Sequence, residues 1–384
     1  MMKKTYSLLI VLICLGCFWA CQEDDQTVLQ QPESFVLNTP KYVSGVYDLK
    51  NTETLEFTCT QPDYGFTAVA IYSVQVSLTE DFSEYKTLPG THTTAKIEVK
   101  GSDFAVALVE LLKIEEESQY PTDLQPVYVR LSSVLTDDGI GKVYSNVITL
   151  PKVKGYFALE PMVMPENIYL AGNITDNWNW NKATEMVPVH SAEGKFWAIQ
   201  YLGKTSENAD AQIKFNTVKA GDAAFGSNDI TIDEKSVDLA GITTNDDGNI
   251  VIGTPGWYIV VVTTTINGRS YEYAVEFHAP YVYLQGDING GNWGTTDAAY
   301  RFTVPDLSAG ASAEFVSPAF TAPSGDGGVR ASIVLEGYDW WKTEFIVLNN
   351  KLEYRGAGED QDRVAGKTGQ KLYINFTAKT GKIE

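Results

Sequence analysis

Histidine, cysteine and basic residues are scarce in this sequence, and each scarcity excludes a class of function. Only three histidines occur in 384 residues, so a histidine-rich metal site is excluded and a Ser-His-Asp triad has few candidates. Lys and Arg total 29 against 49 Asp and Glu, a formal net charge of −20. Nucleic acids and anionic membrane surfaces both attract concentrated positive charge. We therefore expect no nucleic-acid partner, no polybasic membrane patch, no metal and no cofactor.

Long apolar runs are also missing, apart from one at the very start. Two lysines precede an apolar run from Leu8 to Ala20, which has the length of a signal-peptide core and is shorter than the roughly 20 residues of a membrane-spanning helix. A small residue followed by Cys21 is typical of a bacterial lipoprotein signal, and Cys17 is the competing lipidation site. We predict a signal peptide over residues 1–20 and a lipidated Cys21.

This leader accounts for most of the cysteine. Cys14 and Cys17 leave with it and Cys21 carries lipid, so Cys59 is the one thiol left and no intrachain disulfide can form. The loss of two lysines leaves 27 basic against 49 acidic residues, a net charge of −22. The polar residues 21–40, which contain two prolines, are expected to be the lipid anchor and a flexible tether.

Aromatic residues and glycine are plentiful, and together with short alternating segments they predict an all-β protein. There are 21 Tyr, 16 Phe, 8 Trp and 32 Gly. Leu55 to Cys59, Ala70 to Leu78 and Val127 to Leu131 alternate apolar and polar residues, as strands with one buried face do. We predict an immunoglobulin- or fibronectin-like sandwich over residues 41–151, with one amphipathic helix that starts near Ser102.

The rest of the chain is an internal repeat. Tyr169-Leu-Ala-Gly-Asn-Ile174 returns 114 residues later as Tyr283-Leu-Gln-Gly-Asp-Ile288. This length fits two tandem β-sandwich domains, over residues 152–279 and 280–384, which resemble carbohydrate-binding modules. Asn267-Gly268 and Asn349-Asn350 each separate two strand-like segments and predict hairpin turns.

Each repeat places tryptophan in a loop rich in Asn and Gly, directly after its first strand. Such loops favour exposure, and exposed indoles mark contact surfaces. The apolar faces of sugar rings stack on flat indoles, which makes Trp178, Trp180 and Trp293 candidates for glycan binding over the alternative of core packing. Lys214 and Asn216 share one face of a strand and are either hydroxyl ligands or simply solvated. Trp197 and its neighbour Phe196 alternate, so one of the two is expected in the core, and Trp197 is counted among the candidate glycan contacts of the first repeat.

The second repeat carries the densest group of candidates. Trp340 and Trp341 are adjacent, so one is expected to face outward and the other to pack inward. The cations of this group are Arg330, Lys342 and Arg355. A guanidinium presents donors to neighbouring sugar hydroxyls, although these cations equally suit a role in balancing local acids. The sequence has no G-x-S-x-G elbow, P-loop or zinc spacing, and no carboxylate pair stands out, so we expect no catalytic residue.

The order of these features resembles the SusE/SusF outer-membrane lipoproteins of Bacteroidetes, with the domain number of the SusE members. The similarity rests on Cys21 followed by Gln-Glu-Asp-Asp, the repeated Tyr-Leu-x-Gly-[Asn/Asp]-Ile motif, and Asp339-Trp-Trp-Lys-Thr-Glu-Phe345. It implies a non-catalytic protein that binds starch or a related glycan on the outer face of the outer membrane.

The resemblance also implies site residues and partners. In the second repeat the matching positions are Trp293, Arg330, Trp340 and Arg355, with Trp341 and Lys342 adjoining. The first repeat departs from the pattern, since Ala220 to Phe225 lacks a tryptophan. The expected partners are a polysaccharide or oligosaccharide, an outer-membrane glycan transporter and other binding lipoproteins, with membrane contact through the lipid alone. Two other interpretations stay open: an adhesive lipoprotein whose Trp loops bind a protein, and a surface glycosidase.

Overall fold

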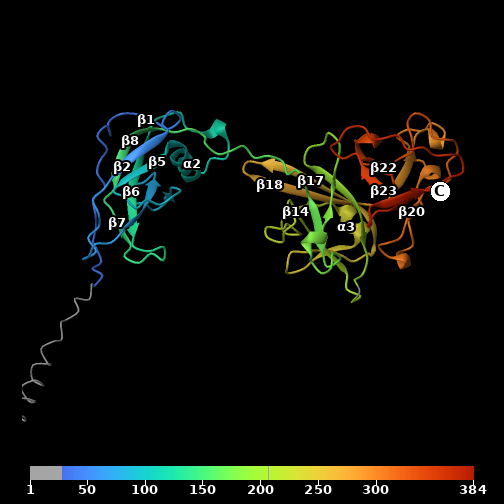
Figure 1. Cartoon of the computed structure of the whole chain (residues 1–384), viewed down its shortest axis with the longest axis horizontal. Helices are drawn as coiled ribbons and strands as arrows, with labels where there is room; N and C mark the ends of the chain where they lie inside the picture. Colours follow the sequence, from blue (N-terminus) through green and yellow to red (C-terminus); the bar gives the residue numbers. More distant parts are fainter. Residues whose placement is uncertain (1–27, 206) are drawn as a thin grey trace, which may run out of the picture. The chain divides into compact units, whose positions relative to one another are not determined.

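The computed structural model describes residues 28–205 and 207–384, in two compact units (Figure 1). The chain up to Pro161 forms the first unit, and Met162–Glu384 form the second. Cys21 and Cys17, with the predicted signal and most of the anchor, lie outside the described residues. The second unit contains both sequence repeats, so the expected boundary near residue 279 does not separate two compact bodies.

The first unit is built from two sheets and one helix around a single core. The larger sheet has the order β1-β8-β6-β3-β4, with β7 also paired to β6, and the smaller one pairs β2 with β5. The strands are β1 (Tyr47–Asp48), β2 (Thr54–Thr58), β3 (Ile71–Ser77), β4 (Lys86–Thr87), β5 (Lys96–Lys100), β6 (Gln125–Val134), β7 (Val143–Tyr144) and β8 (Ile148–Lys154). Alternate residues of β2, β3 and β6 are buried in this core, as the sequence predicted.

The helix of the first unit is α2 (Gly101–Leu112), which packs its apolar residues on the same core. It begins at a glycine because a Cβ at Gly101 would lie 2.1 Å from the carbonyl oxygen of Thr52. It ends where Lys113 adopts the left-handed conformation, with φ of 55°. A short 3₁₀ turn, η2 (Glu117–Gln119), follows. Cys59 is a free, buried thiol in this unit.

The first repeat is a pair of five-stranded sheets with a core between them. One sheet has the order β10-β9-β13-β16-β15 and the other β11-β12-β17-β18-β14. The strands are β9 (Tyr169–Gly172), β10 (Thr184–Glu185), β11 (Val187–Pro188), β12 (Lys195–Leu202), β13 (Ala211–Asn216), β14 (Ile230–Ile232), β15 (Ile242–Thr244), β16 (Ile250–Ile252), β17 (Gly256–Asn267) and β18 (Ser270–His278). The helices are η3 (Trp180–Lys182) and α3 (Glu234–Ala240).

The second repeat is a seven-stranded sheet in the order β19-β21-β22-β23-β25-β24-β20. The strands are β19 (Val282–Gln285), β20 (Phe315–Val316), β21 (Arg330–Ile333), β22 (Glu344–Leu348), β23 (Lys351–Tyr354), β24 (Leu372–Asn375) and β25 (Thr380–Ile383). Four 3₁₀ turns connect them: η4 (Asp287–Asn289), η5 (Ala298–Tyr300), η6 (Leu307–Ala309) and η7 (Trp340–Thr343). The described chain is thus mostly β, with several sheets.

Both predicted hairpins are confirmed. Gly268 and Arg269 join β17 to β18, one residue later than the predicted pair, and Gly268 has a φ of 59°. Asn349 and Asn350 join β22 to β23 with φ values of 51° and 62°. In this second hairpin the positive φ at both central residues is the geometry of a type I′ turn, which asparagine and glycine tolerate better than other residues, whereas the first hairpin has a positive φ only at its first central residue, Gly268, as a type II′ turn does.

In the sheet that contains β12 and β17, these two strands are buried on both faces. Phe196 and Val260 point into the core of the first repeat, whereas Trp197 and Val261 point into a core shared with the second repeat. A sheet covered on both faces needs continuous apolar strands, and Gly256–Asn267 begins with such a run. This sheet is called the shared wall below.

Trp197 was predicted as a glycan contact, and the structure contradicts this. Its indole is fully buried, 6.0 Å from the ring of Phe345 and 5.4 Å from that of Tyr354. Phe196 is buried as well. We expected only one of the two side chains to be buried, because we assumed a sheet with one solvent-exposed face. The second repeat covers that face. Burial also raises the pKa of Tyr354, which therefore stays a neutral phenol.

Candidate functional site

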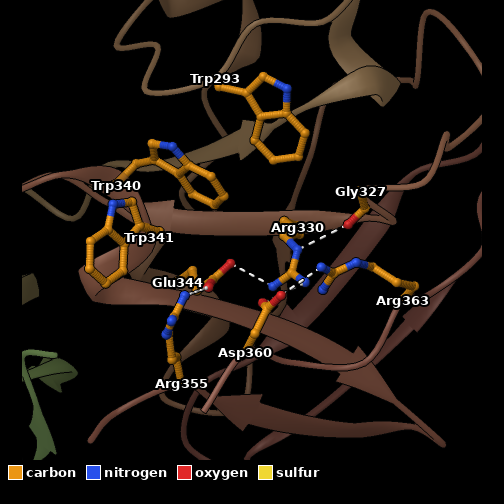
Figure 2. A pocket seen from close by; sticks show the side chains of 9 residues that line it. All are labelled: Trp293, Gly327, Arg330, Trp340, Trp341, Glu344, Arg355, Asp360 and Arg363. Carbon is orange, nitrogen blue, oxygen red and sulfur yellow. Dashed lines mark hydrogen bonds and ion pairs between the residues drawn. The ribbon is translucent and has the colours of Figure 1, made fainter. Parts of the chain in front are cut away.

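An open cleft of about 350 Å³ lies on the second repeat, at the end of β21 and β22 (Figure 2). Indole rings form one side of it and charged side chains the floor. The lining residues are Trp293, Gly327, Arg330, Trp340, Trp341, Glu344, Arg355, Asp360 and Arg363. The structure thus brings together five of the six residues predicted for this repeat. Lys342 is not among the lining residues.

Glycine backbone holds Trp293 in place. A Cβ on Gly286 or Gly327 would approach the indole of Trp293 to 2.5 or 2.6 Å, so the ring lies directly against both backbones. Gly286 also has a φ of 99°, which side-chain-bearing residues rarely adopt. The indole is 41% exposed, as the sequence predicted for a tryptophan in this loop. A large exposed ring held by glycines is suited to contact with a ligand.

Trp340 lies next to Trp293 on the same side of the cleft. The two ring centroids are 4.9 Å apart and the ring planes are inclined by 35° (Figure 2). Trp340 opens the 3₁₀ turn η7, in which consecutive side chains diverge by about 120°. Trp340 and Trp341 are therefore both partly exposed and both line the cleft. The prediction that one of them packs inward was wrong, because it assumed an extended backbone.

Arg330 lies in the floor of the cleft, and nearly all of its hydrogen-bond donors are used within the protein. It is the first residue of β21 and is 3% exposed. Its Nε donates to the carbonyl oxygen of Gly327 at 3.0 Å, and its Nη1 to Glu344 Oε2 at 2.6 Å. Its Nη2 donates to Asp360 Oδ1 at 3.2 Å and to the carbonyl oxygen of Gln361 at 2.9 Å. Four of its five N–H groups are thus used internally.

Glu344 joins two arginines. This carboxylate is 1% exposed, and its second oxygen accepts from Arg355 Nη1 at 2.7 Å. Arg355 also lies over the ring of Trp341, with its guanidinium carbon 4.7 Å from the ring centroid. Its Nε is buried without an acceptor, and its Nη2 has no acceptor among the described residues. Arg355 is therefore a cation of the floor that has donors left for a ligand, as is the more exposed Arg363.

Asp360 and Arg363 complete the floor from the loop after β23. Arg363 Nη2 donates to Asp360 Oδ2 at 2.6 Å, while the other oxygen of Asp360 accepts from Arg330. The sequence analysis missed Glu344, Asp360 and Arg363. Glu344 had a signal, since an acid at the start of an apolar strand needs a buried cation as its partner. The other two lie in a polar loop that gave no such signal.

Lys342 lies beside the cleft rather than in it. Its Nζ is 5.6 Å from the ring centroids of both Tyr338 and Trp341, on the outer side of η7. Its backbone carbonyl accepts from His190 N at 2.9 Å, and the His190 ring meets the edge of Trp341 at 5.2 Å. The first repeat therefore supports η7 directly.

The first repeat has a related cleft of about 270 Å³. Its lining residues are Trp178, Trp180, Lys214, Gly221, Ala224, Asp247 and Asn249. Lys214 pairs with Ala171, the third residue of β9, just as Arg330 pairs with Gln285, the third residue of the motif in β19. The two cations thus hold the same register in the two repeats. Lys214 Nζ donates to the carbonyl oxygen of Asp247 at 2.7 Å.

Asn216 is not available to a ligand, contrary to the prediction. It is 3% exposed, and its Nδ2 donates to the carbonyl oxygens of Ala220 and Asp222 at 2.6 and 2.9 Å. Its Oδ1 accepts from the backbone of Thr217 at 2.7 Å. Asn216 therefore shapes the loop that follows β13. Strand alternation placed it correctly beside Lys214, but the loop covers it.

Within residues 28–205 and 207–384, no group of three potential metal ligands occurs. The same residues include no helix with the length and apolar character to span a bilayer.

Two family models match this chain. The model described as "SusF/SusE starch specific CBMs" matches residues 167–274 and 281–382, one match for each repeat. The model described as "SusE outer membrane protein" matches residues 22–131. The chain belongs to the SusE/SusF family. This confirms the resemblance, and it identifies the repeats as carbohydrate-binding modules of a non-catalytic, outer-membrane family.

One curated relative is the outer membrane protein SusF of Bacteroides thetaiotaomicron. It is 37% identical over 239 residues, which are 59% of this chain and 45% of SusF, so the chain spans about half the length of this relative. The crystal structure of SusF from the same organism aligns over 91% of this chain and 99% of that chain, with 22% identity and a TM-score of 0.45.

Proposed function

We propose that this SusE/SusF protein binds starch-like α-glucan at the cell surface without cleaving it, chiefly through the cleft of the second repeat. The observation that carries the proposal is the tilted pair of Trp293 and Trp340. Two adjacent indoles inclined by 35° form a bent arc rather than a flat platform. An α-linked glucan chain curves, so consecutive glucose rings can each lie against one face of such an arc. The family description supports this choice of ligand.

The floor of the cleft supplies the polar half of the recognition. The Arg355 donors that lack protein acceptors are suited to the hydroxyls of a glucose unit held on the arc. Glu344 and Trp341 hold the guanidinium from two sides, so little side-chain entropy is lost when a ligand binds. Arg330 contributes by fixing Glu344, Gly327 and Asp360. It acts mainly through these neighbours, because most of its donors are used.

The related cleft of the first repeat is proposed as a second glycan site. Trp178 and Trp180 supply its aromatic side and Lys214 its cation. Two modest sites that hold the same polymer gain by effective concentration, because the second contact becomes intramolecular once the first has formed. This advantage matters for a protein that holds long chains at a surface.

The remaining parts of the chain fit a surface binder. We propose that Cys21 carries the lipid anchor, that residues 26–40 form the tether, and that the first unit is an immunoglobulin-like spacer. The protein would then face the cell exterior and deliver glycan to an outer-membrane transporter together with other binding lipoproteins. Its net charge does not repel a neutral glycan, so the few cations of the cleft can act at short range.

Affinity electrophoresis in gels that contain starch, pullulan or a β-glucan tests the proposal. The mature protein is expected to be retarded by starch and pullulan, and a double Trp293→Ala, Trp340→Ala variant much less so. Tyr42→Ala is a matched control, since it removes an aromatic ring that is 75% exposed in the first unit. Equal retardation of the double variant and the parent, or no retardation by any glycan, would contradict the proposal. A pulled-down protein that the double variant loses would instead favour the adhesive interpretation.

A further inference from the structure

The first repeat has two further clefts that meet the related cleft already described, which we now call the central cleft. One, of about 710 Å³, begins at Trp178, a residue that it shares with the central cleft, and we call it the long cleft. The other, of about 490 Å³, is lined by Tyr271 and Tyr273 and shares Ala224 with the central cleft. We call it the tyrosine cleft. Each of the two further clefts thus adjoins the central cleft through one shared lining residue.

From this continuity we infer that the first repeat binds an extended stretch of glucan along all three clefts, whereas the second repeat binds a short segment in one. The inference rests on the proposed function, and it adds that the two repeats differ in the length of chain they recognise. It assigns two subsites, the long cleft and the tyrosine cleft.

The chemistry of the long cleft suits an uncharged polymer rich in hydroxyls. Its walls carry the neutral side chains of Asn177, Gln200, Thr205, Gln212 and Thr377, which both donate and accept hydrogen bonds. Gln212 accepts from two asparagines through Oε1, and its Nε2 has no acceptor among the described residues.

Charged groups of the long cleft are mostly neutralised in pairs. Lys204 Nζ donates to Asp210 Oδ1 at 2.7 Å, and Asp176 pairs with Lys182. A cleft whose charges are paired offers no strong field to an ion, while Gln212 Nε2 keeps a donor for a hydroxyl. Ala311 and Thr377 come from the second repeat, so the far wall exists only because the repeats are joined.

The backbone is strained where the long and central clefts meet. Asp176, Asn177 and Trp178 have consecutive φ values of 47°, 54° and 66°. The left-handed conformation costs about 1–2 kcal/mol for a residue with a side chain, and a bulky aromatic is especially rare there. The surrounding bonds impose it, since Trp178 N and Thr175 Oγ1 both donate to the carbonyl oxygen of Gly172. The strain places an indole between two clefts, where one ring contacts a chain that passes from one to the other.

The tyrosine cleft adjoins the central cleft at Ala224, and the three clefts together are called the track. Phe225 stacks on Tyr273 with ring centroids 3.7 Å apart and planes inclined by 8°, so Tyr273 is a rigid part of the wall. Tyr271 is held by a hydrogen bond from its hydroxyl to the carbonyl oxygen of Val163 at 2.6 Å. Rigid tyrosine rings offer stacking surface at little entropic cost.

The test is the dependence of affinity on chain length, measured by isothermal titration calorimetry with maltotriose and maltoheptaose. A Trp293→Ala, Trp340→Ala background leaves the first repeat to bind, and a Trp178→Ala, Trp180→Ala background leaves the second. Longer chains bind tighter on statistical grounds alone, so the second background is the matched control. We expect the ratio of the two dissociation constants to be about tenfold larger in the first background, equivalent to about 1.4 kcal/mol.

A variant that fills the long cleft tests its contribution separately from that of the central cleft. Ala311→Trp, added to the first background, places bulk in the long cleft without a change at Trp178. The ratio should then fall toward that of the control background, and an unchanged or larger ratio overturns the role of the long cleft. Equal ratios in the two unblocked backgrounds overturn the track and leave the proposed function intact. Loss of all binding in both backgrounds and in the parent would overturn the proposed function itself.

Discussion

The two repeats use one strand frame for two different binding surfaces. Lys214 and Arg330 hold the same register on their strands, and tryptophan follows the first strand in both. In the second repeat a network of buried ions lies under a pair of indoles. In the first repeat the cation is bound to a backbone carbonyl, and the tryptophan sits on a strained turn between clefts.

The difference shows how a duplicated fold diverges. Strand pairing fixes the backbone position of the cation, whereas the loops determine which side chains surround it. Glu344 recruits Arg330 and Arg355 into a rigid floor, and nothing comparable surrounds Lys214. The first repeat instead has two further clefts that adjoin its central one. The second repeat thus has a rigid cleft, whereas the first repeat has a longer series of clefts.

The largest expected effect comes from the shared wall. Trp197→Ala should lower the free energy of unfolding of the second unit by about 3–5 kcal/mol, because a fully buried indole leaves a cavity. Urea unfolding followed by tryptophan fluorescence measures this well, since the seven tryptophans after Trp19 all lie in residues 178–341. Trp180→Ala, at a partly exposed position, is the control and should cost much less. Two separate transitions, with one unmoved by Trp197→Ala, would show that the repeats unfold independently.

The next largest effect concerns the charged residues under the two clefts. Glu344→Gln should destabilise the protein by about 3 kcal/mol, because it leaves two arginines without their buried counter-charge. Asp247→Asn changes an exposed acid in the first repeat and should stay within about 0.5 kcal/mol. Thermal denaturation of both variants checks this. Similar losses in the two would mean that the buried network gives the second repeat no special rigidity.

A third effect separates the adjacent tryptophans. Trp340→Ala removes one face of the arc and should weaken glucan binding about tenfold in a background that lacks Trp178 and Trp180. Trp341→Ala should weaken it about threefold, since Trp341 acts through Arg355, over which it lies. Calorimetry with maltoheptaose gives both numbers. A larger loss for Trp341→Ala than for Trp340→Ala would reverse the assignment of their roles.

The smallest effect concerns backbone strain in the loop after β13. Ala223 has a φ of 58°, so Ala223→Gly should stabilise the protein by up to about 1 kcal/mol. Ala224 is the adjacent alanine and has no positive φ, so Ala224→Gly should destabilise by about 0.5–1 kcal/mol. Opposite shifts in melting temperature are expected. Shifts of the same sign would show that the loop is not strained at Ala223.

The sequence predicted the local features of this fold and the exposed part of its site. Asn267-Gly268 and Asn349-Asn350 predicted hairpins because turn geometry depends on the turn residues themselves. The family resemblance grouped Trp293 and Trp340 in one site, and the structure brings their ring centroids to 4.9 Å. Their role as ligand contacts stays a prediction.

The failures have tertiary causes. Trp197 was misassigned because nothing in the strand itself reveals that a second repeat covers its other face. Asn216 was misassigned because its own loop folds back over it. Asp360 and Arg363 were missed because they reach the floor from a long loop whose path depends on Arg330. Alternation and motifs predict which way a side chain leaves its strand, and they do not predict what it meets.

The shared wall also limits how this protein can be modified by evolution or by design. A module joined by a linker can be cut out, duplicated or exchanged for another. Here β12 and β17 contribute side chains to two cores at once, so removal of either repeat would expose apolar side chains that the other covers. The two repeats of this chain therefore cannot be exchanged one at a time. Further change in glycan preference must therefore come from the loops, with the wall kept as it is.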